Sequence, residues 1–425
     1  MEPETPTAAN PTPEIAQGPT NAAFAFIVVT VLLDILAVGI VIPVLPKLIE
    51  IFVKGDTAQA AMIAGVFLMV WEGMQFIFSP LVGSLSDRFG RRPIILLSNA
   101  GLGLDYVLMA TAPSLGFLFL GRILSGITAA SFSTANAYIA DVLPAEKRAK
   151  AFGMLGAAFG LGFIVGPAFG GVLGEISPRL PFWVAAALSL LNALYGVFVL
   201  PESLPLDKRD AFVWKSANPL GALHLLRKYP ETRGLSAAVF FFNVAHFVLQ
   251  SIFVLYAGHH FGWGPRDVGL ALTVVGVCSA IVQGGLVGPI VARIGERNAI
   301  RFGTVCGIFA FAAYGLAPSG PLFFIGMPLM ALWGISGPSI QKVLSERVGP
   351  SEQGRLQGSL TSIVALAGIL SPLVFAKAFA ATVGKNAWIP WTGFPFYLSS
   401  VALGIGLIFA IRGTSSTDST RPEPN

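Results

Sequence analysis

The sequence predicts an all-α integral membrane protein, with twelve transmembrane helices in two pseudo-symmetric bundles of six. The first observation is composition: the 425 residues are 54% hydrophobic and only 12% charged, whereas a soluble domain carries about 25% charged residues. The second is a series of apolar runs of about 20 residues, the length that crosses a bilayer as a helix. The third is a motif that occurs once in each half. These observations exclude a soluble chain of this length.

The predicted spans are apolar runs separated by short polar loops. In chain order they cover 23–47, 60–82, 93–112, 115–140, 149–174, 181–201, 234–258, 267–292, 299–317, 320–341, 356–381 and 391–411. The longest polar interval, 202–233, is a predicted cytoplasmic loop between two six-helix bundles, which cover 22–201 and 234–412. Residues 1–21 and 413–425 have the composition of disordered tails.

The Lys and Arg residues predict the orientation. The loops after even-numbered spans, together with the central loop, hold 18 of the 27 Lys and Arg residues, and the opposite loops hold six. Positive residues gather on the cytoplasmic side of membrane proteins, so both termini are predicted to be cytoplasmic and the protein to lie in the plasma (inner) membrane. Because the positive charges are spread along these loops, no nucleic-acid partner is predicted.

The two halves repeat each other. Gly83, Arg88, Gly90 and Arg92 recur at a constant offset of 205 residues as Gly288, Arg293, Gly295 and Arg297. A duplicated chain of this kind is typical of secondary transporters, whose substrate sites lie near the midplane between the halves.

The stretch 83–93, "GSLSDRFGRRP", joins spans 2 and 3 on the predicted cytoplasmic face. A positive-inside anchor would account for its arginines, but not for Asp87 or the two glycines. Gly83 permits close helix approach, Gly90 permits a tight turn, and Asp87 can pair with an arginine. We interpret the loop as a gate that opens when helices rock, formed by Gly83, Asp87, Arg88, Gly90, Arg91 and Arg92.

This loop resembles the signature loop of the major facilitator superfamily. The segments "LLDILAVGIVIPVLP", "GLDYVLMA", "LGRILSGITAAS", "LGAAFGLGFIVGPAFGG" and "GRLQGSL" further resemble the tetracycline (metal-tetracycline/H⁺) resistance antiporters of the drug:H⁺ antiporter group. The resemblance implies the major facilitator fold and antiport driven by a proton gradient, without a cofactor and with a metal chelate as one possible substrate. It also marks Asp34 as a functional acid, and Asp105 and Arg122 as functionally sensitive.

The residues themselves point to the same three positions. Asp34 lies near the middle of span 1, where an ionisable group is unfavourable and by default functional; the alternative is a helix-packing Asp. Asp105 and Arg122 each lie roughly 10 Å below the outer surface, so adjacent helices can pair them. Such a pair is either linked to the proton or to the substrate, or it is purely structural.

Polar side chains on helix faces are expected to line a substrate cavity. Glu72 and Gln75 share a face of span 2, and Asn243, His246 and Gln250 share a face of span 7. His246 could titrate near neutral pH, and its alternative role is that of a hydrogen-bonded packing residue. Gln283 and Asn136 are similar but weaker candidates. The full set of cavity candidates is Glu72, Gln75, Asn136, Asn243, His246, Gln250, Gln283 and Trp333. No metal site is predicted.

The stretch 156–171, "GAAFGLGFIVGPAFGG", carries glycines at spacings that allow tight helix packing, and a proline that cannot donate a backbone hydrogen bond. It resembles the motif of the superfamily's exporters, and ordinary packing is the alternative. The residues concerned are Gly156, Gly160, Gly166, Pro167, Gly170 and Gly171.

The chain departs from the tetracycline antiporters in its second half. Gly307 stands where that family has an acidic residue in span 9, and Ser279 stands at or near the position of a His in span 8. The cavity is therefore expected to be more apolar and aromatic, which suits an amphiphilic or aromatic solute.

The predicted function is proton-coupled efflux of amphiphilic drug-like compounds such as tetracycline, by alternating access. A proton-coupled importer is the alternative within transport, and a non-transporting membrane sensor is the alternative from another class. An enzyme is not predicted, because no nucleophile–base pair, phosphate-binding loop or metal cluster occurs at recognisable spacing. The expected partners are the small-molecule substrate, protons and the lipid bilayer, and the expected state is a monomer.

Overall fold

A computed structural model of the chain describes residues 20–129, 131–143, 145–209, 225–349, 352–385 and 387–415. Most of the two predicted tails and residues 210–224 of the predicted central loop lie outside this part. Within it, the regular structure is helical, with no strand. The helix α1 (Thr20–Val41) begins inside the predicted N-terminal tail, and α16 (Phe394–Ser415) ends inside the predicted C-terminal tail.

The first bundle follows the predicted spans closely. After α1 come α2 (Leu45–Phe52), α3 (Thr57–Phe89), α4 (Arg91–Thr111), α5 (Leu115–Thr128), α6 (Ser131–Val142), α7 (Ala145–Ile176) and α8 (Leu180–Val199). Predicted span 4 is two helices, α5 and α6, and predicted span 1 continues past a turn into α2. The 3₁₀ turn η1 (Leu206–Lys208) follows α8.

The second bundle repeats this plan. It contains α9 (Leu225–Lys228), η3 (Pro230–Thr232), α10 (Arg233–Phe261), α11 (Pro265–Ile281), the π-helical turn η4 (Val282–Leu286), α12 (Val287–Leu316), α13 (Gly320–Trp333), α14 (Ser336–Ser345), α15 (Gln353–Val383) and α16. Span 10 is divided into α13 and α14, just as span 4 is divided into α5 and α6. The apolar stretch Pro265–Leu316 holds predicted spans 8 and 9.

The duplication is also visible in the backbone. Gly90 has φ 105° and ψ 162°, and its counterpart Gly295 has φ 75° and ψ 161°. Both lie in a region of positive φ that favours glycine. Gly90 separates α3 from α4, and Gly295 bends α12 where predicted spans 8 and 9 meet.

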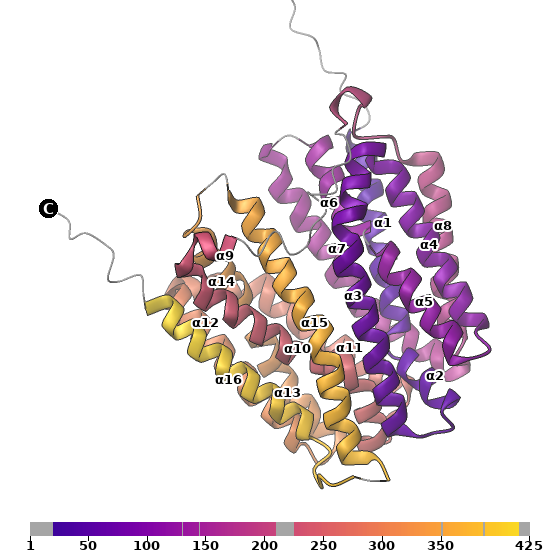
Figure 1. Ribbon diagram of the computed structural model, residues 1–425, viewed down its shortest axis with the longest axis vertical. Helices are drawn as coiled ribbons and strands as arrows, with labels where there is room; N and C mark the ends of the chain where they lie inside the picture. Colours follow the sequence, from indigo (N-terminus) through magenta and orange to yellow (C-terminus); the bar gives the residue numbers. More distant parts are fainter. Residues whose placement is uncertain are drawn as a thin grey trace, which may run out of the picture.

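The two bundles lie side by side (Figure 1). Across their interface α3 packs on α15 and α7 packs on α11. Close contacts lie toward the end that carries α2: a Cβ atom added at Gly65 would be 2.7 Å from the Ala376 side chain, and one added at Gly171 would be 2.6 Å from the Pro265 carbonyl. The bundles therefore meet at this end.

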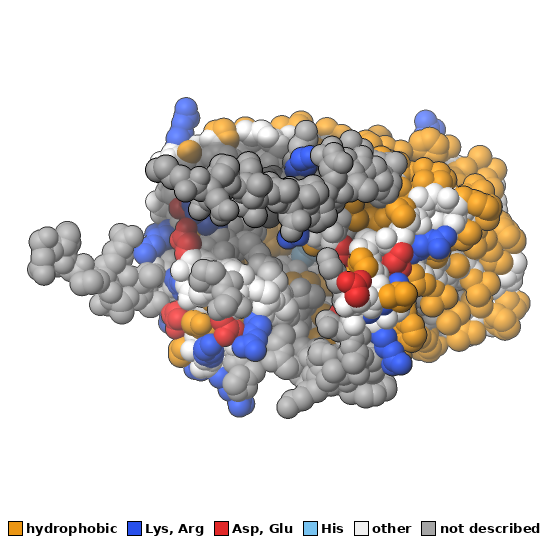
Figure 2. Space-filling model, turned by 90° about the horizontal axis from the view of Figure 1, so that it is seen from above, with side chains coloured by type: hydrophobic (Ala, Val, Ile, Leu, Met, Phe, Trp, Pro, Cys, Tyr) orange, Lys and Arg blue, Asp and Glu red, His pale blue; other side chains and the backbone are white. Residues whose placement is uncertain are grey.

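At the opposite end the bundles are apart. A Cβ atom added at Gly83, Gly153 or Gly288 would meet nothing within 4 Å, and the ribbons diverge toward this end in Figure 1. Figure 2 looks onto it and shows charged side chains on both bundles beside an apolar flank. The structure is thus open at the end that carries the loop 83–93.

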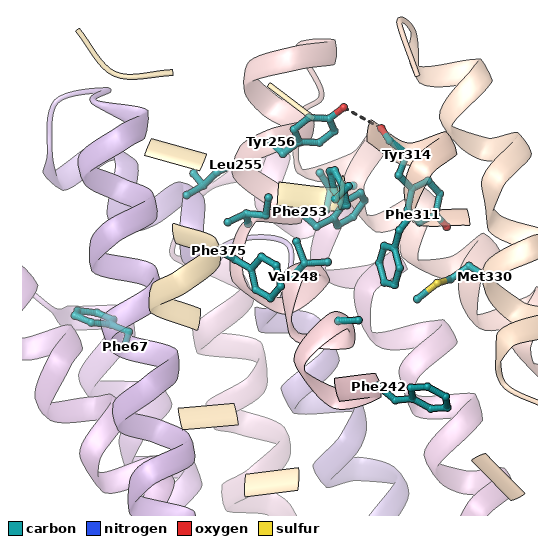
Figure 3. Packing of buried hydrophobic residues seen from close by; sticks show 14 of the residues in the cluster. Phe67, Phe242, Val248, Phe253, Leu255, Tyr256, Phe311, Tyr314, Met330 and Phe375 are labelled. Atoms are coloured by element: carbon teal, nitrogen blue, oxygen red, sulfur yellow. Dashed lines mark hydrogen bonds between the residues drawn. The ribbon is translucent and has the colours of Figure 1, made fainter. Parts of the chain in front are cut away.

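Aromatic side chains fill the core of the second bundle (Figure 3). The Tyr256 hydroxyl donates a hydrogen bond of 3.2 Å to the Tyr314 carbonyl. The Tyr314 ring stacks on Phe323 with centroids 4.2 Å apart, and the Tyr256 ring packs edge-on against Phe396 at 4.8 Å. Pairs of this geometry add about 0.5–1.5 kcal/mol each to the burial of their apolar area. They pack the outer part of the second bundle as a layer of aromatic side chains.

Candidate functional site

Asp34 lies inside the first bundle, between α1, α4 and α8. Its side chain is 6% exposed. The Asn192 amide donates to Asp34 Oδ1 at 3.1 Å and to the Thr30 carbonyl at 3.2 Å. The Asn99 amide, oriented with its nitrogen toward the acid, donates to Asp34 Oδ2 at 3.0 Å. Asp34 is thus an acceptor held by two amide side chains from other helices.

Asn99 and Asn192 are not among the residues that the sequence predicted for the site. Asn192 is 158 residues from Asp34 in the chain, so no local spacing connects them. Both asparagines are 0% exposed. A buried amide in a membrane helix needs polar partners. The occurrence of Asn99 and Asn192 inside apolar spans was the one sequence signal that could have identified them as site residues.

The structure brings Asp105 and Arg122 together, as their equal depth predicts. Arg122 Nη2 lies 3.1 Å from Asp105 Oδ2 and 3.0 Å from the Met109 sulfur. Asp105 is 0% exposed, and among the described residues its second oxygen has no hydrogen-bond partner. The pair joins α4 to α5 within the first bundle, so the ionic contact is buried and incompletely satisfied.

The polar stripe of α10 lies beside an aromatic side chain of α13. Asn243 donates to the Val239 carbonyl at 2.8 Å within its own helix. His246 and Gln250 are exposed although they lie in the middle of a membrane-spanning helix. The His246 ring centroid is 5.9 Å from that of Trp333. His246 and Trp333 are therefore neighbours on the side where α10 and α13 approach each other.

The remaining cavity candidates lie on three other helices. Gln283 is in the π-helical turn η4, and its amide donates to the Gly334 carbonyl at 3.1 Å, at the break between α13 and α14. Such π-turns are frequent at functional sites. Gln75 on α3 and Asn136 on α6 are partly buried. Glu72 on α3 is also partly buried and faces the second bundle.

Trp333 occupies the space that a side chain at position 307 would need. A Cβ atom added at Gly307 would lie 2.8 Å from Trp333 Cγ and 2.8 Å from Leu403 Cδ1. Contacts below 3.0 Å require the neighbours to move. The position of the Trp333 ring therefore depends on the absence of a side chain at Gly307. An acidic side chain at 307 would not fit in this packing.

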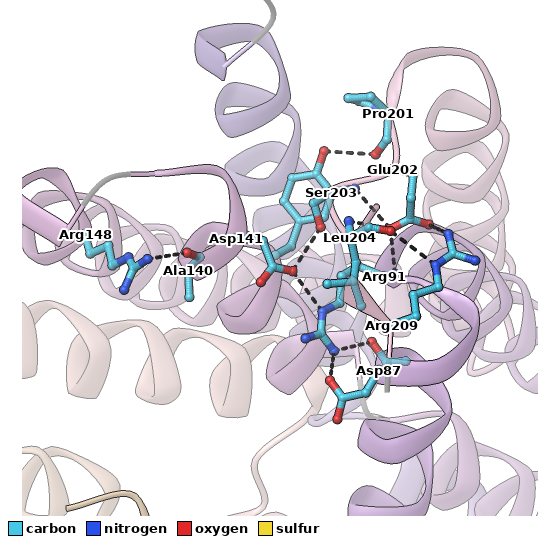
Figure 4. Close-up of polar contacts among 12 residues, drawn as sticks. Asp87, Arg91, Ala140, Asp141, Arg148, Pro201, Glu202, Ser203, Leu204 and Arg209 are labelled. Carbon is cyan, nitrogen blue, oxygen red and sulfur yellow. Dashed lines mark hydrogen bonds and ion pairs between the residues drawn. The ribbon is translucent and has the colours of Figure 1, made fainter. Parts of the chain in front are cut away.

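The predicted loop 83–93 is helical except at Gly90, since it consists of the end of α3 and the start of α4; it forms an ion-pair network within the first bundle (Figure 4). Arg91 contacts Asp87 Oδ1 at 2.5 Å through Nη1 and Asp141 Oδ2 at 3.0 Å through Nε. The Arg91 backbone N–H donates to Glu202 at 2.8 Å, and Glu202 forms an ion pair with Arg209 at 3.8 Å. The network fastens the loop to the ends of α6 and α8.

Two other arginines of the loop differ in their contacts. The Arg92 guanidinium donates to the Val197 carbonyl at 2.6 Å. The Arg88 guanidinium carbon lies 5.1 Å from the centroid of the Phe89 ring. Gly83, which we expected to permit close helix approach, has nothing within 4 Å of an added Cβ atom. The bundles are apart where α3 ends in this conformation, so close approach at Gly83 stays a prediction.

The glycine-rich stretch of α7 divides into two parts. A Cβ atom added at Gly166 would be 2.8 Å from the Gly39 backbone, and one added at Gly170 would be 2.1 Å from the Ile40 carbonyl oxygen. Gly171 faces α11, and α7 continues through Pro167 without ending. At Gly156 and Gly160 an added Cβ atom would meet nothing within 4 Å. For those two, which lie where the bundles have separated, close packing is absent in this conformation and stays a prediction.

Two bundles that meet at one end, with buried polar groups between helices, define a secondary membrane transporter. The model of the Major Facilitator Superfamily matches residues 27–372. The chain belongs to this superfamily, which confirms the predicted fold, and it is a multi-pass membrane transporter and not an enzyme.

Curated relatives match over almost the whole chain. The chain is 37% identical to the class C tetracycline resistance protein of Escherichia coli, over 89% of this chain and 95% of that protein. It is 35% identical to the class B protein of Escherichia coli, over 94% of this chain and 99% of that protein. The predicted resemblance to the tetracycline resistance antiporters is therefore confirmed.

Solved structures share the fold. The human organic anion transporter MFSD10 (TETRAN) has a TM-score of 0.67 and 24% identity, covering 93% of this chain and all of that one. A bacterial homologue of the human lysosomal transporter Spinster, in an inward-facing and unoccupied conformation, has a TM-score of 0.72 and 19% identity, covering 96% of this chain and all of that one.

Proposed function

We propose that this protein exports tetracyclines, or amphiphilic compounds of similar chemistry, in exchange for protons. The observation that carries the proposal is similarity to tetracycline resistance proteins along almost the entire chain, combined with acids held inside the first bundle. Asp34 and the Asp105–Arg122 pair are the proton-coupling groups. Export, rather than import, is supported by the similarity to tetracycline resistance proteins, because active export lowers the internal concentration of a drug.

The orientation is part of the proposal. Both termini and the basic loops face the cytoplasm, in the inner membrane of a bacterium. The open end that carries loop 83–93 is then the cytoplasmic end, and the conformation is ready to admit a solute from inside the cell. The two bundles rock about the midplane, and a monomer without a cofactor suffices.

The solute binds between the bundles. The candidates for its contacts are the polar stripe of α10, with Asn243, His246 and Gln250, and the Trp333 ring beside it. Gln75, Asn136 and Gln283 complete the proposed lining. Because Trp333 fills the space at Gly307, recognition on that side is aromatic and apolar rather than ionic. This supports a flat, amphiphilic substrate.

The loop 83–93 and the glycine stretch of α7 act as gating elements. Arg91 keeps the loop fastened to Asp141 and Glu202 while the cytoplasmic end is open. Gly156 and Gly160 have open space around them in this state, and we propose that they meet the second bundle when the cytoplasmic end closes. Small residues at such a contact allow close approach.

The test uses inside-out membrane vesicles with an imposed inside-acid pH gradient. Addition of a magnesium–tetracycline chelate is expected to dissipate the gradient in the native protein. Asp34→Asn should abolish this signal. Asp207→Asn, which changes an exposed acid outside the bundles, is the matched control and should behave as the native protein does. Proton-driven tetracycline transport by Asp34→Asn at the native rate would refute the assigned role of Asp34.

A further inference from the structure

A third acid lies at the centre of a membrane-spanning helix. Glu72 is the sixteenth residue of the 33-residue helix α3. It is partly buried. Within the described part of the chain, its carboxyl group makes no hydrogen bond and no ion pair, and its oxygens keep some accessible surface. In this it differs from Asp34, which has two amide donors, and from Asp105, which has Arg122.

Glu72 lies on the contact between the bundles. A Cβ atom added at Gly368 of α15 would be 2.9 Å from Glu72 Oε2 and 2.7 Å from Cζ of Phe247 of α10. The carboxyl group is therefore placed against the backbone of α15 and beside an aromatic ring. A side chain at position 368 would require Glu72 or Phe247 to move.

The protonation state follows from this position. An ionised carboxylate at the depth of the bilayer centre, without a hydrogen-bond donor, is strongly unfavourable. The neutral acid fits the packed arrangement of α3 on α15. In a state with the bundles apart at the end where they now meet, Glu72 would lose its contact with α15 and be hydrated more fully. Hydration favours the ionised form.

The neighbouring helices carry few groups that could share this role. The helices packed on α3 are α2, α4, α5, α6, α10 and α15. Asp105 and Arg122 are paired with each other, and Glu50 is paired with Lys47 at 2.6 Å. The remaining titratable or charged side chains described on these helices are Arg91, Arg92, Tyr106, Tyr138, Asp141, His246, Tyr256, His259, His260, Arg233, Arg355 and Lys377. Of the membrane-spanning helices α4, α10 and α15, only α10 has one of these groups, His246, near its centre. A histidine is neutral or positive, so His246 cannot replace Glu72 as an acid.

We propose that Glu72 binds a proton that holds the two bundles together at their contact: the neutral carboxyl group packs on α15, and its ionisation releases α3 from α15. The direction of coupling rests on the proposed export function. A proton arriving from outside, while α3 and α15 are apart, lets them close. Once the cytoplasmic end is open, the proton leaves Glu72 for water in the cavity. The ionised carboxylate weakens the contact between α3 and α15, so the bundles can separate there after the substrate has bound.

The first experiment measures closure directly, without substrate. Ala58→Cys and Gly384→Cys are combined in a Cys278→Ser/Cys306→Ser background, because a Cβ atom at position 384 lies 3.1 Å from Cβ of Ala58. The rate of disulfide formation between them reports how often α3 and α15 are in contact at this end. The rate is measured across the pH range in which the protein stays folded, with Glu72 and with Glu72→Gln. Thiol ionisation affects both proteins equally and cancels in the ratio of the two rates.

The two proteins are compared by a ratio: the rate of disulfide formation with Glu72 present, divided by the rate of disulfide formation in the Glu72→Gln variant. This ratio is expected to be near one at low pH and to fall as pH rises. The slope is at most about tenfold per pH unit, the limit for one linked proton. Glu346→Gln changes an exposed acid at the other end and should give the native profile. A ratio that does not change with pH overturns the proposal.

Two further variants keep the test decisive if Glu72→Gln folds poorly. Glu72→Asp retains an acid and should retain a pH-dependent rate. Gly368→Ala should lower the rate at every pH, because its methyl group would meet the Glu72 carboxyl group, whereas Gly337→Ala has open space and should not. Equal rates for the two alanine variants would contradict the packing on which the proposal depends.

The disulfide experiment and the transport experiment can fail independently. If the rate ratio falls with pH but tetracycline is not transported, Glu72 remains the proposed proton-binding residue and only the proposed substrate is refuted. Proton-coupled tetracycline transport with a flat ratio would refute the role of Glu72 alone.

Discussion

Replacing Asp105 by Asn removes the negative charge that faces Arg122 and changes little in shape. The two groups are 3.1 Å apart, and at an effective dielectric constant of about 20 their attraction is about 5 kcal/mol before desolvation is subtracted. The other described contact of Arg122 is the Met109 sulfur, a weak acceptor. Asp105→Asn therefore leaves a buried, unneutralised cation. Removing one partner of such a pair destabilises a protein by about 3–5 kcal/mol.

A double-mutant cycle isolates the pair. The free energy of unfolding is measured in detergent micelles for the native protein, Asp105→Asn, Arg122→Gln and the double variant. The double variant has no unpaired charge, so it is expected to be more stable than the sum of the two single changes by about 2 kcal/mol or more. Additivity within about 0.5 kcal/mol would refute the reasoning and would show that the contact does not stabilise the bundle.

Two other predictions concern the first bundle. Asn192→Leu removes an amide that donates to Asp34. The pH profile of proton-driven transport in vesicles is therefore expected to shift, with transport retained at the new optimum. An unchanged profile would contradict the positioning role of the amide. Gly170→Ala places a methyl group 2.1 Å from the Ile40 carbonyl oxygen and is expected to destabilise by about 1–3 kcal/mol, measured by thermal unfolding. Gly160→Ala, with open space around it, is the control and should change stability by less than about 0.5 kcal/mol; equal loss in both would contradict the packing.

The fold and one ion pair could be predicted because they depend on periodicity and depth. Span length follows from bilayer thickness, and equal depth on consecutive helices placed Asp105 opposite Arg122. The duplicated loop also predicted the backbone, since Gly90 and Gly295 share an unusual conformation. These features are local, or repeat at a fixed interval.

The rest of the site could not be predicted because it depends on packing between distant segments or on the conformational state. Asn192 reaches Asp34 across 158 residues. Trp333 fills the space at Gly307, a relation invisible in one sequence. Gly156 has the spacing of a packing glycine but faces open space, because a transporter that alternates between two states uses each contact only part of the time.

The two bundles differ in where their acids lie. In the described helices of the second bundle, Asp267 is in the first turn of α11 and Glu296 is beside the bend at Gly295, and no Asp or Glu occurs from 299 to 345 or from 353 to 383. The first bundle holds Asp34, Glu72 and Asp105 well inside its helices. On the proposed function, proton coupling then rests with the first bundle, and the second supplies the aromatic part of the proposed substrate site. Substitutions around Trp333 are accordingly expected to change the range of exported compounds while proton coupling is retained.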